Sequence, residues 1–280
     1  MIAVVDSGSS KAEWIFSDGK SQDIVETGGL NPRVLGEEDL SEVMKQIAER
    51  YPGKVNQIYF YGAGCSTKDS QAIVRKAIGR NFPGSSVHVN SDMMGAAIAV
   101  CGNEPGIVGI LGTGSNSVFY DGMELQPNNF GLGYVLADEG GGCDLGKALI
   151  TSFLYETMPE EIRRSFFKEY ALTREVVLRE VYNKPSPNAW MASFAAFPVL
   201  HRGNAWMESL LEERFAAFFR LYVLSYPQHR VVPLHFVGSI AKNYRDVLER
   251  IAGKNFCMPG KILQKPAGAL MSWHLGLAKS

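Results

Sequence analysis

Hydrophobic residues follow two patterns along the chain. Some occur in short runs bounded by Gly, Ser or Asp, which is typical of strands, and others recur every three or four positions, which is typical of amphipathic helices. At the start of the chain the first pattern predicts a strand at residues 2–5 and a return strand at 13–16, joined by the turn DSGSSK. Asp18-Gly19 then closes a hairpin toward a third strand around Ile24 and Val25.

The same arrangement recurs in the middle of the chain. Residues 107–111 predict a strand, the sequence GTGSN at 112–116 predicts a turn, and residues 117–120 predict a return strand. Asp121-Gly122 then closes the next hairpin. A supersecondary unit that occurs twice indicates two related halves.

Between the two copies the pattern alternates between helices and strands. Helical spacing at residues 40–47, 73–78 and 93–100 alternates with apolar runs at 55–61 and 87–89. A β-rich start followed by crossovers of this kind favours a mixed sheet with helices packed on it.

The second half contains a long helical segment. Residues 144–226 are mainly helical in pattern, residues 231–237 predict a strand, and residues 241–251 predict a helix. The sequence therefore predicts an α/β protein of two related domains, the second of which carries an insertion of helices. The stretch NEPG at residues 103–106 is the natural boundary.

Composition excludes several classes of protein. The 280 residues include 28 Lys and Arg against 29 Asp and Glu, and this net charge of −1 provides no broad basic surface for nucleic acid or an anionic membrane. With 46% hydrophobic and 20% charged residues the composition is that of a folded soluble protein, and the most apolar stretch is interrupted well short of a membrane span. The first residues contain no basic leader, which favours a cytoplasmic location. We therefore expect no nucleic acid partner and no membrane partner.

Cysteine and histidine are too scattered to form a familiar metal site. The four cysteines and five histidines lie far apart and make no CxxC pair, zinc-finger spacing or HExxH pattern. We interpret Cys65, Cys101, Cys143 and Cys257 as reduced structural thiols, and we expect no histidine-ligated transition metal.

The two Gly/Ser turns are candidate anion sites. Successive backbone N–H groups at a hairpin tip can converge on a phosphate, with hydroxyls of Ser9, Ser10, Thr113 and Ser115 as further donors and Lys11 as a charge. Neither turn matches a Walker P-loop or a dinucleotide fingerprint. Ordinary hairpins are the alternative, because Gly and Ser are common in turns for conformational reasons. Two such turns, one from each half, favour the binding of a polyphosphate.

Two aspartates stand at the ends of predicted strands. Asp6 ends the first strand, where its carboxylate can reach a magnesium ion on phosphate oxygens or can accept hydrogen bonds from turn amides. Asp92 opens the helix that follows the strand at 87–89, where it can deprotonate an attacking hydroxyl or can cap the helix. Position along the chain leaves both pairs of alternatives open.

Two glycine-rich junctions complete the candidates. Residues 131–142, GLGYVLADEGGG, surround Asp138 and Glu139, and paired carboxylates can accept several hydrogen bonds from a polyol. A flexible loop with a helix cap is the alternative there. The strand at 231–237 runs into Gly238-Ser239, a junction that could pass close to a flat nucleotide base.

In their order along the chain these motifs resemble the actin-like ATPase superfamily of sugar kinases, and most closely the N-acetylglucosamine kinase branch grouped with the BadF/BadG-type ATPases. DSGSSK is similar to the first phosphate motif of the family, GTGSN to its second, and NSDMMGA to the connecting motif with the catalytic aspartate. FVGSIAKNY is similar to the adenosine motif, and PAGALMSWHLGL to the C-terminal helix that returns to the first domain. The match covers nearly the whole chain.

The resemblance implies a two-domain actin-like ATPase fold of the ribonuclease H-like type. Each domain would be a mixed sheet with flanking helices, and the active site would lie in the interdomain cleft. The implied domains are residues 1–104 together with 267–280, and residues 105–266. The implied cofactors are ATP and Mg²⁺, with Asp6 organising the metal and Asp92 acting as the general base toward a sugar hydroxyl.

The other implied roles fall into two groups. ATP would be bound by Gly8, Ser9, Ser10, Lys11, Gly112, Thr113, Gly114, Gly238, Ser239 and Lys242. The sugar would face Asn31, Ser115, Asn116, Gly133, Asp138 and Glu139 in addition to Asp92. The sequence departs from the family pattern at Leu132, where some animal relatives have a tryptophan, so sugar packing is expected to differ.

The leading hypothesis is an ATP-dependent kinase for an amino sugar, with N-acetylglucosamine 6-phosphate as the product. N-acetylmuramate and glucosamine are alternative substrates, because recognition of the acyl or lactyl group depends on pocket shape. A nucleotide-dependent switch and a sensor without turnover are alternatives of a different class. The resemblance also makes dimerisation of two identical chains through the helical insertion an expectation.

Overall fold

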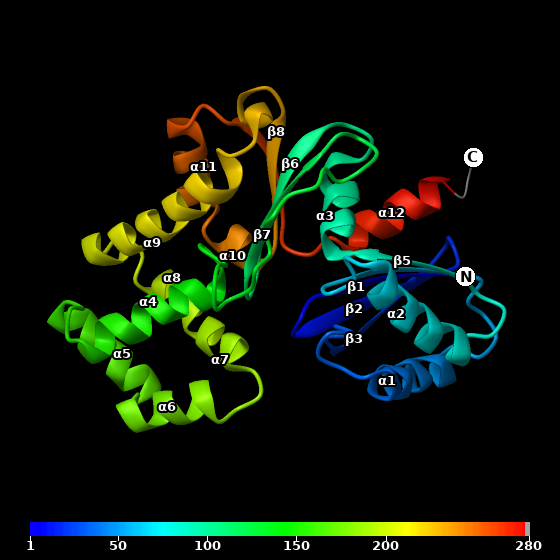
Figure 1. The fold of residues 1–280 in the computed structure, drawn as a ribbon, viewed down its shortest axis with the longest axis horizontal. Helices are drawn as coiled ribbons and strands as arrows, with labels where there is room; N and C mark the ends of the chain where they lie inside the picture. Colours follow the sequence, from blue (N-terminus) through cyan, green and yellow to red (C-terminus); the bar gives the residue numbers. More distant parts are fainter. Residues whose placement is uncertain (278–280) are drawn as a thin grey trace. The chain divides into compact units, whose positions relative to one another are not determined.

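Two sheets, one in each of two units, organise residues 1–277, which are the residues that the computed structural model describes (Figure 1). Unit 1 comprises Met1–Glu104, Tyr120–Leu125 and the chain from Lys265 onward. Unit 2 comprises Pro105–Phe119 and Gln126–Gln264. Residues 278–280 of the predicted C-terminal return segment lie outside the described residues.

The sheet of unit 1 has five strands in the order β3-β2-β1-β4-β5. The strands are β1 (Ile2–Ser7), β2 (Lys11–Ser17), β3 (Gln22–Gly28), β4 (Gln57–Gly62) and β5 (Ser86–Ser91). β1 pairs antiparallel with β2 and parallel with β4, and β4 pairs parallel with β5. The carboxyl ends of β1, β4 and β5 therefore meet at one edge of the sheet, where Asp6 lies level with Tyr61 and Tyr61 with Asn90.

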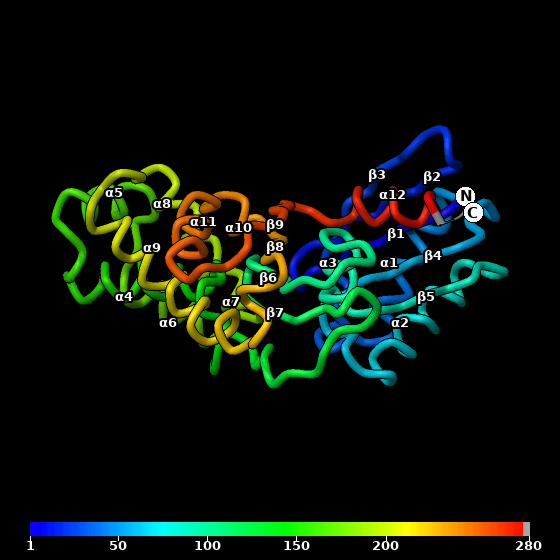
Figure 2. Tube along the Cα trace, turned by 90° about the horizontal axis from the view of Figure 1, so that it is seen from above, coloured from blue at the N-terminus to red at the C-terminus, as the bar shows by residue number. Residues whose placement is uncertain are grey.

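Helices cover both faces of this sheet because the apolar residues of its strands alternate between them. The helices are α1 (Glu37–Arg50), α2 (Lys68–Asn81), α3 (Asp92–Cys101) and α12 (Ala267–Leu277). Ala3 and Val5 of β1 share a core with α1 and α2, whereas Val4 packs in a second core with α12. Figures 1 and 2 show α12 beside this sheet, so the last helix of the chain completes the unit formed by the first hundred residues.

The sheet of unit 2 has four strands in the order β7-β6-β8-β9. They are β6 (Gly106–Leu111), β7 (Ser115–Tyr120), β8 (Pro233–Val237) and β9 (Met258–Leu263), and β8 pairs parallel with both β6 and β9. Leu111 at the end of β6 and Val237 at the end of β8 lead into the second Gly/Ser turn and into Gly238, respectively.

Most of the helices of unit 2 come from a single insertion between β7 and β8. The α-helices of the insertion are α4 (Gly142–Leu154), α5 (Glu160–Tyr170), α6 (Arg174–Tyr182), α7 (Pro187–Ser193), α8 (Phe197–Leu200) and α9 (Ala205–Phe218). Shorter turns are the 3-10 helix η1 (Phe194–Ala196), the π-helix η2 (Phe219–Val223) and the 3-10 helix η3 (Pro227–Arg230). α10 (Ser239–Asn243) and α11 (Arg245–Lys254) follow β8. Apart from η3, these helices share one core with the sheet, and aromatic side chains such as Phe197, Phe215 and Phe218 are fully buried there.

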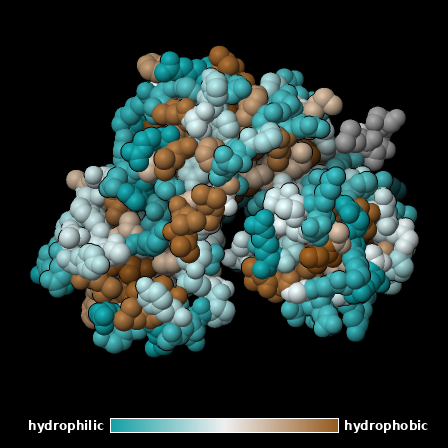
Figure 3. All heavy atoms as spheres, viewed as in Figure 1, coloured by the Kyte–Doolittle hydropathy of each residue, from teal (hydrophilic) through white to brown (hydrophobic). Residues whose placement is uncertain are grey.

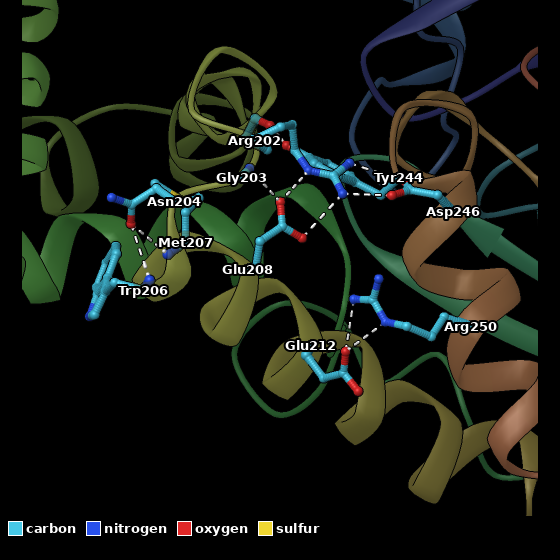
Figure 4. Close-up of polar contacts among 11 residues, drawn as sticks. Arg202, Gly203, Asn204, Trp206, Met207, Glu208, Glu212, Tyr244, Asp246 and Arg250 are labelled. Atoms are coloured by element: carbon cyan, nitrogen blue, oxygen red, sulfur yellow. Dashed lines mark hydrogen bonds and ion pairs between the residues drawn. The ribbon is translucent and has the colours of Figure 1, made fainter.

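A network of ion pairs holds α9 against α11. The guanidinium of Arg202 donates to Glu208 at the start of α9 and to Asp246 at the start of α11. One turn further along α9, Glu212 accepts hydrogen bonds from Arg250 of α11 at 2.8 and 3.1 Å (Figure 4). These pairs are mostly solvent-exposed and contribute little energy individually, but together they fix the direction of α9.

One face of the protein is seen in Figure 3. Figure 3 shows a mainly hydrophilic face with hydrophobic side chains in separate groups. Within residues 1–277, no helix combines the length and the apolar character that crossing a membrane requires.

Three elements differ from the sequence prediction. The helix predicted at 241–251 is divided at Tyr244. The ring of Tyr244 is buried, and its hydroxyl donates a hydrogen bond to the carbonyl of Ala195. The hairpin at Asp121-Gly122 continues only as a single bridge between Tyr120 and Leu125. The strand β9 was not predicted, because Pro259 and Gly260 interrupt its apolar pattern.

Candidate active site

Asp6 and Asp92 lie at the carboxyl edge of the unit 1 sheet. Asp6 is the penultimate residue of β1, and Asp92 is the first residue of α3, which follows β5 directly. The cap of α3 is Ser91, whose Oγ accepts the N–H of Met94 at 3.2 Å. Asp92 therefore does not serve as the helix cap, and its Oδ1 accepts the N–H of its neighbour Met93 at 2.9 Å.

Burial raises the pKa of both carboxyls. Burial raises the pKa of Asp6 to about 7, the negative charges of Asp92 and Glu13 add to the effect, and Lys265 opposes it. Burial also raises the pKa of Asp92. Carboxylate oxygens are the donors that a hard divalent cation prefers, and Asp6, whose negative charge Asp92 disfavours, fits a site for Mg²⁺. Within residues 1–277, this pair included, no cluster of three or more His, Cys, Asp or Glu side chains could hold a metal ion on its own.

The first Gly/Ser turn presents unused backbone donors. Gly8, Ser9 and Ser10 are exposed, and in the described part of the chain none of their N–H groups donates to the protein. The segment of Gly29 and Leu30 packs against this turn. Ser7 Oγ accepts the N–H of Leu30 at 2.9 Å, and a side chain at Gly29 would overlap the carbonyl of Ser9. Lys11 begins β2 with its side chain exposed. The turn is thus a rigid hairpin whose tip can accept an anion.

Asn31 lies at the same edge of the sheet, beside the turn after β4. Its Oδ1 accepts the N–H of Arg33 at 2.9 Å, and a side chain at Gly64 would overlap that same oxygen. Arg33 in turn donates to Ser66 Oγ at 3.1 Å. Unit 1 therefore brings together four of the predicted elements of the site: the first turn, Asn31, Asp6 and Asp92.

In unit 2 the second Gly/Ser turn is fastened to the start of α4. Gly142 N–H donates to the carbonyl of Gly112, and Cys143 N–H donates to that of Thr113, both at 2.8 Å. Gly141 approaches so closely that a side chain there would lie 2.6 Å from the carbonyl carbon of Gly114. The first amides of α4 are in this way satisfied by the turn rather than by a side-chain cap.

Residues 137–141, here named the acidic loop, contact this turn through Asp138. A side chain at Gly114 would overlap the Asp138 carboxylate, and the backbone of Ser115 donates a hydrogen bond to that carboxylate. Ser115 Oγ donates to the carbonyl of Glu139 at 2.8 Å. Burial raises the pKa of Asp138, against the lowering effects of Ser115 and of Lys147. Asp138 has a φ of 73°, which is the left-handed conformation, so tertiary contacts must hold it.

The capping alternative does not hold for the acidic loop. The cap of α4 is Gly141, without a side-chain hydrogen bond, and the carboxylate that reaches back over the helix start is Asp144, which accepts the N–H of Gly140 at 3.0 Å. Asp138 and Glu139 are thus spared for other partners.

Other predicted sugar contacts of unit 2 are distributed unevenly. Asn116 Oδ1 accepts the N–H of Ser117, and its Nδ2 lies about 3.0 Å from where a side chain at Gly131 would start. Gly133 belongs to a separate turn, where its carbonyl accepts the N–H groups of Leu136 and Ala137. Asn116 is therefore at the base of the loop with Ser115, whereas no described contact joins Gly133 to Asp138.

Gly238 lies against the end of β6. With a φ of 123° it adopts a conformation that suits only glycine, and a side chain there would overlap the carbonyl of Leu111. Ser239 then begins α10, and Lys242 is exposed near its end. The structure thus brings Gly238 to Leu111 and Gly112, with Ser239 next to it in the chain and Lys242 one helical turn further on.

Sequence reasoning missed two groups of residues at these sites. Tyr222 contacts both acidic residues of the loop, and Arg214 approaches Asp144 at 3.7 Å. In unit 1, Lys265 pairs with Glu13 and Glu26 at 2.6 Å each, beside the strand that carries Asp6. None of these residues belongs to a recognisable motif, because their partners are distant in the sequence.

Similarity to known proteins is found among solved structures. No family model matches the chain, and no curated protein matches its sequence. Among solved structures, the putative N-acetylglucosamine kinase of Porphyromonas gingivalis is 36% identical, with a TM-score of 0.92 over 99% of both chains. The putative N-acetylglucosamine kinase of Chromobacterium violaceum is 16% identical, with a TM-score of 0.70 over 98% of both chains.

A third solved structure, a ROK-family glucokinase from Streptomyces griseus in complex with glucose and AMPPNP, is 13% identical and has a TM-score of 0.52 over 99% of both chains. The likeness to the Chromobacterium violaceum and Streptomyces griseus structures shows the fold, which is the actin-like ATPase fold of sugar kinases. The 36% identity over nearly the whole length shows more: the chain belongs to the N-acetylglucosamine kinase-like family of that superfamily. The α/β actin-like fold expected from the sequence is thereby confirmed.

Proposed function

We propose that this protein transfers the γ-phosphoryl group of ATP to the 6-hydroxyl of N-acetylglucosamine, with Asp92 as the general base. The observation that carries the proposal is the state of Asp92: it begins α3 but leaves the capping to Ser91, and burial raises its pKa. A carboxylate with a raised pKa is a stronger proton acceptor. The family relationship supports the sugar as the acceptor.

In the proposed reaction the sugar oxygen forms a bond to the γ-phosphorus while the bond from that phosphorus to the ADP oxygen breaks. Asp92 takes the proton that leaves the sugar hydroxyl. Mg²⁺ held at Asp6 would neutralise charge on the phosphates. The exposed amides of residues 8–10, the hydroxyls of Ser10 and Thr113, and Lys11 would bind phosphate oxygens.

We further propose how the two substrates are recognised. The adenosine would lie beside Gly238, Ser239 and Lys242, where Gly238 packs closely against the end of β6. The sugar hydroxyls would donate to Asp138 and Glu139 and exchange hydrogen bonds with Asn31, Ser115 and Asn116. Gly133, which makes a turn of its own, would border the sugar from the backbone.

Asp92→Asn tests the assignment of the base. Asparagine keeps the shape and the acceptor for Met93 N–H but cannot take a proton, so turnover is expected to fall about 10²-fold or more while binding of a non-hydrolysable ATP analogue is retained. Asp69→Asn is the matched control, because Asp69 is an exposed residue of the first turn of α2. Unchanged turnover in Asp92→Asn would remove Asp92 as the base.

The sugar is identified by ADP release with Mg²⁺ across N-acetylglucosamine, N-acetylmuramate, N-acetylmannosamine, glucosamine and glucose, with the phosphate position read by NMR. Release that depends on N-acetylglucosamine and yields the 6-phosphate is the expected result. Preference for N-acetylmuramate or glucosamine would correct the substrate. Slow hydrolysis that no sugar stimulates would favour a nucleotide-dependent switch instead.

The proposal includes two properties of the protein in its cell. We expect a cytoplasmic enzyme, and we expect a homodimer formed through the helical insertion. Fractionation tests the first expectation, and light scattering of the purified protein tests the second.

A further inference from the structure

The end of α9 and the π-helix η2 pack against the acidic loop. Leu224 N–H donates to the carbonyl of Phe219 at 2.9 Å, five residues back, which is the hydrogen bond of a π-helical turn. Such turns shift the phase of the side chains that follow and are frequent at functional sites. Here the shifted residue is Tyr222, whose side chain reaches the acidic loop.

The hydroxyl of Tyr222 makes two hydrogen bonds to consecutive residues of the loop. It accepts the N–H of Asp138 at 3.2 Å and donates to Oε2 of Glu139 at 2.8 Å. A phenol has one proton to donate, and Glu139 accepts it. The hydroxyl therefore both donates a hydrogen bond to the acidic loop and accepts one from it. The side chain of Tyr222 is almost fully buried, and its two hydrogen bonds to the loop are part-buried.

Aromatic neighbours fix the ring of Tyr222 in this position. Phe218 stacks on it at a centroid distance of 5.1 Å, with an angle of 19° between the planes. The ring of Phe130, which precedes the acidic loop in the sequence, packs edge-on against the ring of Tyr222 at a centroid distance of 4.9 Å. The hydroxyl thus points at the loop from a ring that has little freedom to rotate.

The same helix holds the next residues of the loop. Gly140, at a φ of 74°, lies against Phe215 and Phe218 of α9. The N–H of Gly140 donates to Asp144, which Arg214 of α9 approaches at 3.7 Å. Asp138 is in the left-handed conformation, which costs energy unless neighbouring contacts stabilise it, and Tyr222 supplies such a contact at its N–H.

We propose that Tyr222 is a positioning residue for sugar recognition, and that it fixes Asp138 and Glu139 so that their carboxylates meet the sugar hydroxyls already oriented. This inference rests on the proposed function, because it assumes that these carboxylates bind the sugar. It gives the helical insertion a role in the site, since the insertion supplies the residue that orders the loop. Preorganised acceptors bind better because less freedom is lost on binding.

Tyr222→Phe tests the proposal with the ring kept and only the hydroxyl removed. The KM for the sugar is expected to rise about tenfold, the effect of losing one buried hydrogen bond, while kcat and the KM for ATP change by less than about threefold. Hydrogen exchange at residues 137–141 is expected to become faster in the absence of any ligand. Phe130→Leu, which removes the edge contacts of this ring to Tyr222 and Tyr226, is expected to shift both quantities the same way by a smaller factor. This variant decides the matter should Tyr222→Phe not fold.

Tyr244→Phe is the matched control. Its hydroxyl is also buried in unit 2 and donates to the carbonyl of Ala195 at 2.6 Å, away from the acidic loop. An unchanged sugar KM in Tyr222→Phe, or an equal rise in Tyr244→Phe, would overturn the proposal.

Failure of the proposed function has a different signature. A wild-type protein that phosphorylates no sugar would refute that function. In that case, accelerated exchange of the loop in Tyr222→Phe would show that Tyr222 orders the loop, and the role in sugar recognition would be overturned.

Discussion

At the scale of single residues, close backbone approach around Gly114 determines where the Asp138 carboxylate can lie. Gly114 has an ordinary backbone conformation, so its lack of a side chain is required by its surroundings rather than by its φ. A β-carbon there would overlap the carboxylate of Asp138, and Gly141 already packs against the carbonyl carbon of Gly114. The carboxylate occupies the space that a side chain would fill.

Gly114→Ala is therefore expected to displace Asp138 while the turn itself keeps its shape. Because a shift of about 1 Å in a binding group can cost about 10²-fold, kcat/KM for the sugar is expected to fall between about 10- and 10²-fold. Steady-state kinetics with the sugar varied checks this. A kcat/KM equal to that of the wild type would mean that sugar binding does not need Asp138 where the structure has it.

Gly79→Ala in α2 is the control for this substitution. No atom lies within 4 Å of the position that its β-carbon would take, and alanine suits a helix better than glycine. The variant is expected to gain ~0.5 kcal/mol in the free energy of unfolding and to keep wild-type kinetics.

At the scale of elements, α12 stabilises unit 1 through a face that contains a titratable group. Ala267, Leu270 and Met271 pack in one core with β1 and β2, and His274 continues that face. The Nε2 of His274 lies 2.9 Å from the hydroxyl of Tyr61, and its ring stacks on Tyr59 at 3.6 Å. Burial, with the nearby His88 as a second cause, lowers the pKa of His274 to about 4.

This lowered pKa predicts a loss of stability in acid. The unfolded chain, in which histidine has a pKa near 6.5, takes up a proton before the folded chain does, so stability is complete above pH 6.5 and decreases as the pH falls toward 4. The contribution of this one group is ~1 kcal/mol per pH unit in that window. Chemical denaturation of the wild type at pH 7.5 and at pH 5 measures it.

His274→Gln keeps a polar partner for Tyr61 but cannot titrate. Its difference in stability between the two pH values is expected to be smaller than that of the wild type, although His235, whose pKa burial also lowers to about 4, keeps part of the dependence. The value at pH 7.5 gives the cost of the substitution itself, so the variant is its own control. An equal decrease in both proteins would assign the acid sensitivity to other groups.

Elements with a strong local signal were predictable from the sequence, and those that depend on distant partners were not. The β1–β2 hairpin and its Asp18-Gly19 turn follow from apolar alternation and turn chemistry alone. β9 could not be predicted, because proline is a strand-breaking signal in a sequence pattern. Pro259 is tolerated there because β9 lies at the edge of its sheet.

The same distinction applies to the candidate site. Asp6 and Asp92 could be singled out because each stands at the end of a strand in a motif of known type. Whether Asp92 capped its helix could not be decided from the sequence, since the decision rests on the hydroxyl of Ser91. Tyr222 gave no signal at all, because an aromatic residue in an apolar helix is usually a core residue and its π-helical turn arises from tertiary contacts.

At the scale of the whole molecule, two units with separate cores are joined by a chain that passes between them repeatedly. Residues 105–119 and 126–264 belong to one unit, and the hairpin turn of residues 120–125 belongs to the other, where Tyr120 donates to the carbonyl of Gly102. Each unit holds its hydrophobic cluster independently. Units of this kind can open separately, and hydrogen exchange reports each of them.

The proposed substrates are expected to stabilise both units, because ATP and the sugar are each assigned residues from both. A ligand that binds only folded protein adds ~2.7 kcal/mol at 100 times its Kd, and the protection appears in whichever unit must be folded for binding. With a non-hydrolysable ATP analogue, Mg²⁺ and N-acetylglucosamine present, exchange is expected to slow in β1 and α3 of unit 1 and in β6 and β8 of unit 2. Slowing confined to one unit would contradict the assignment of Asn31 and Asp92 to the same substrate as Asp138. Asp92→Asn should keep the protection while losing turnover, since binding and proton transfer depend on different atoms.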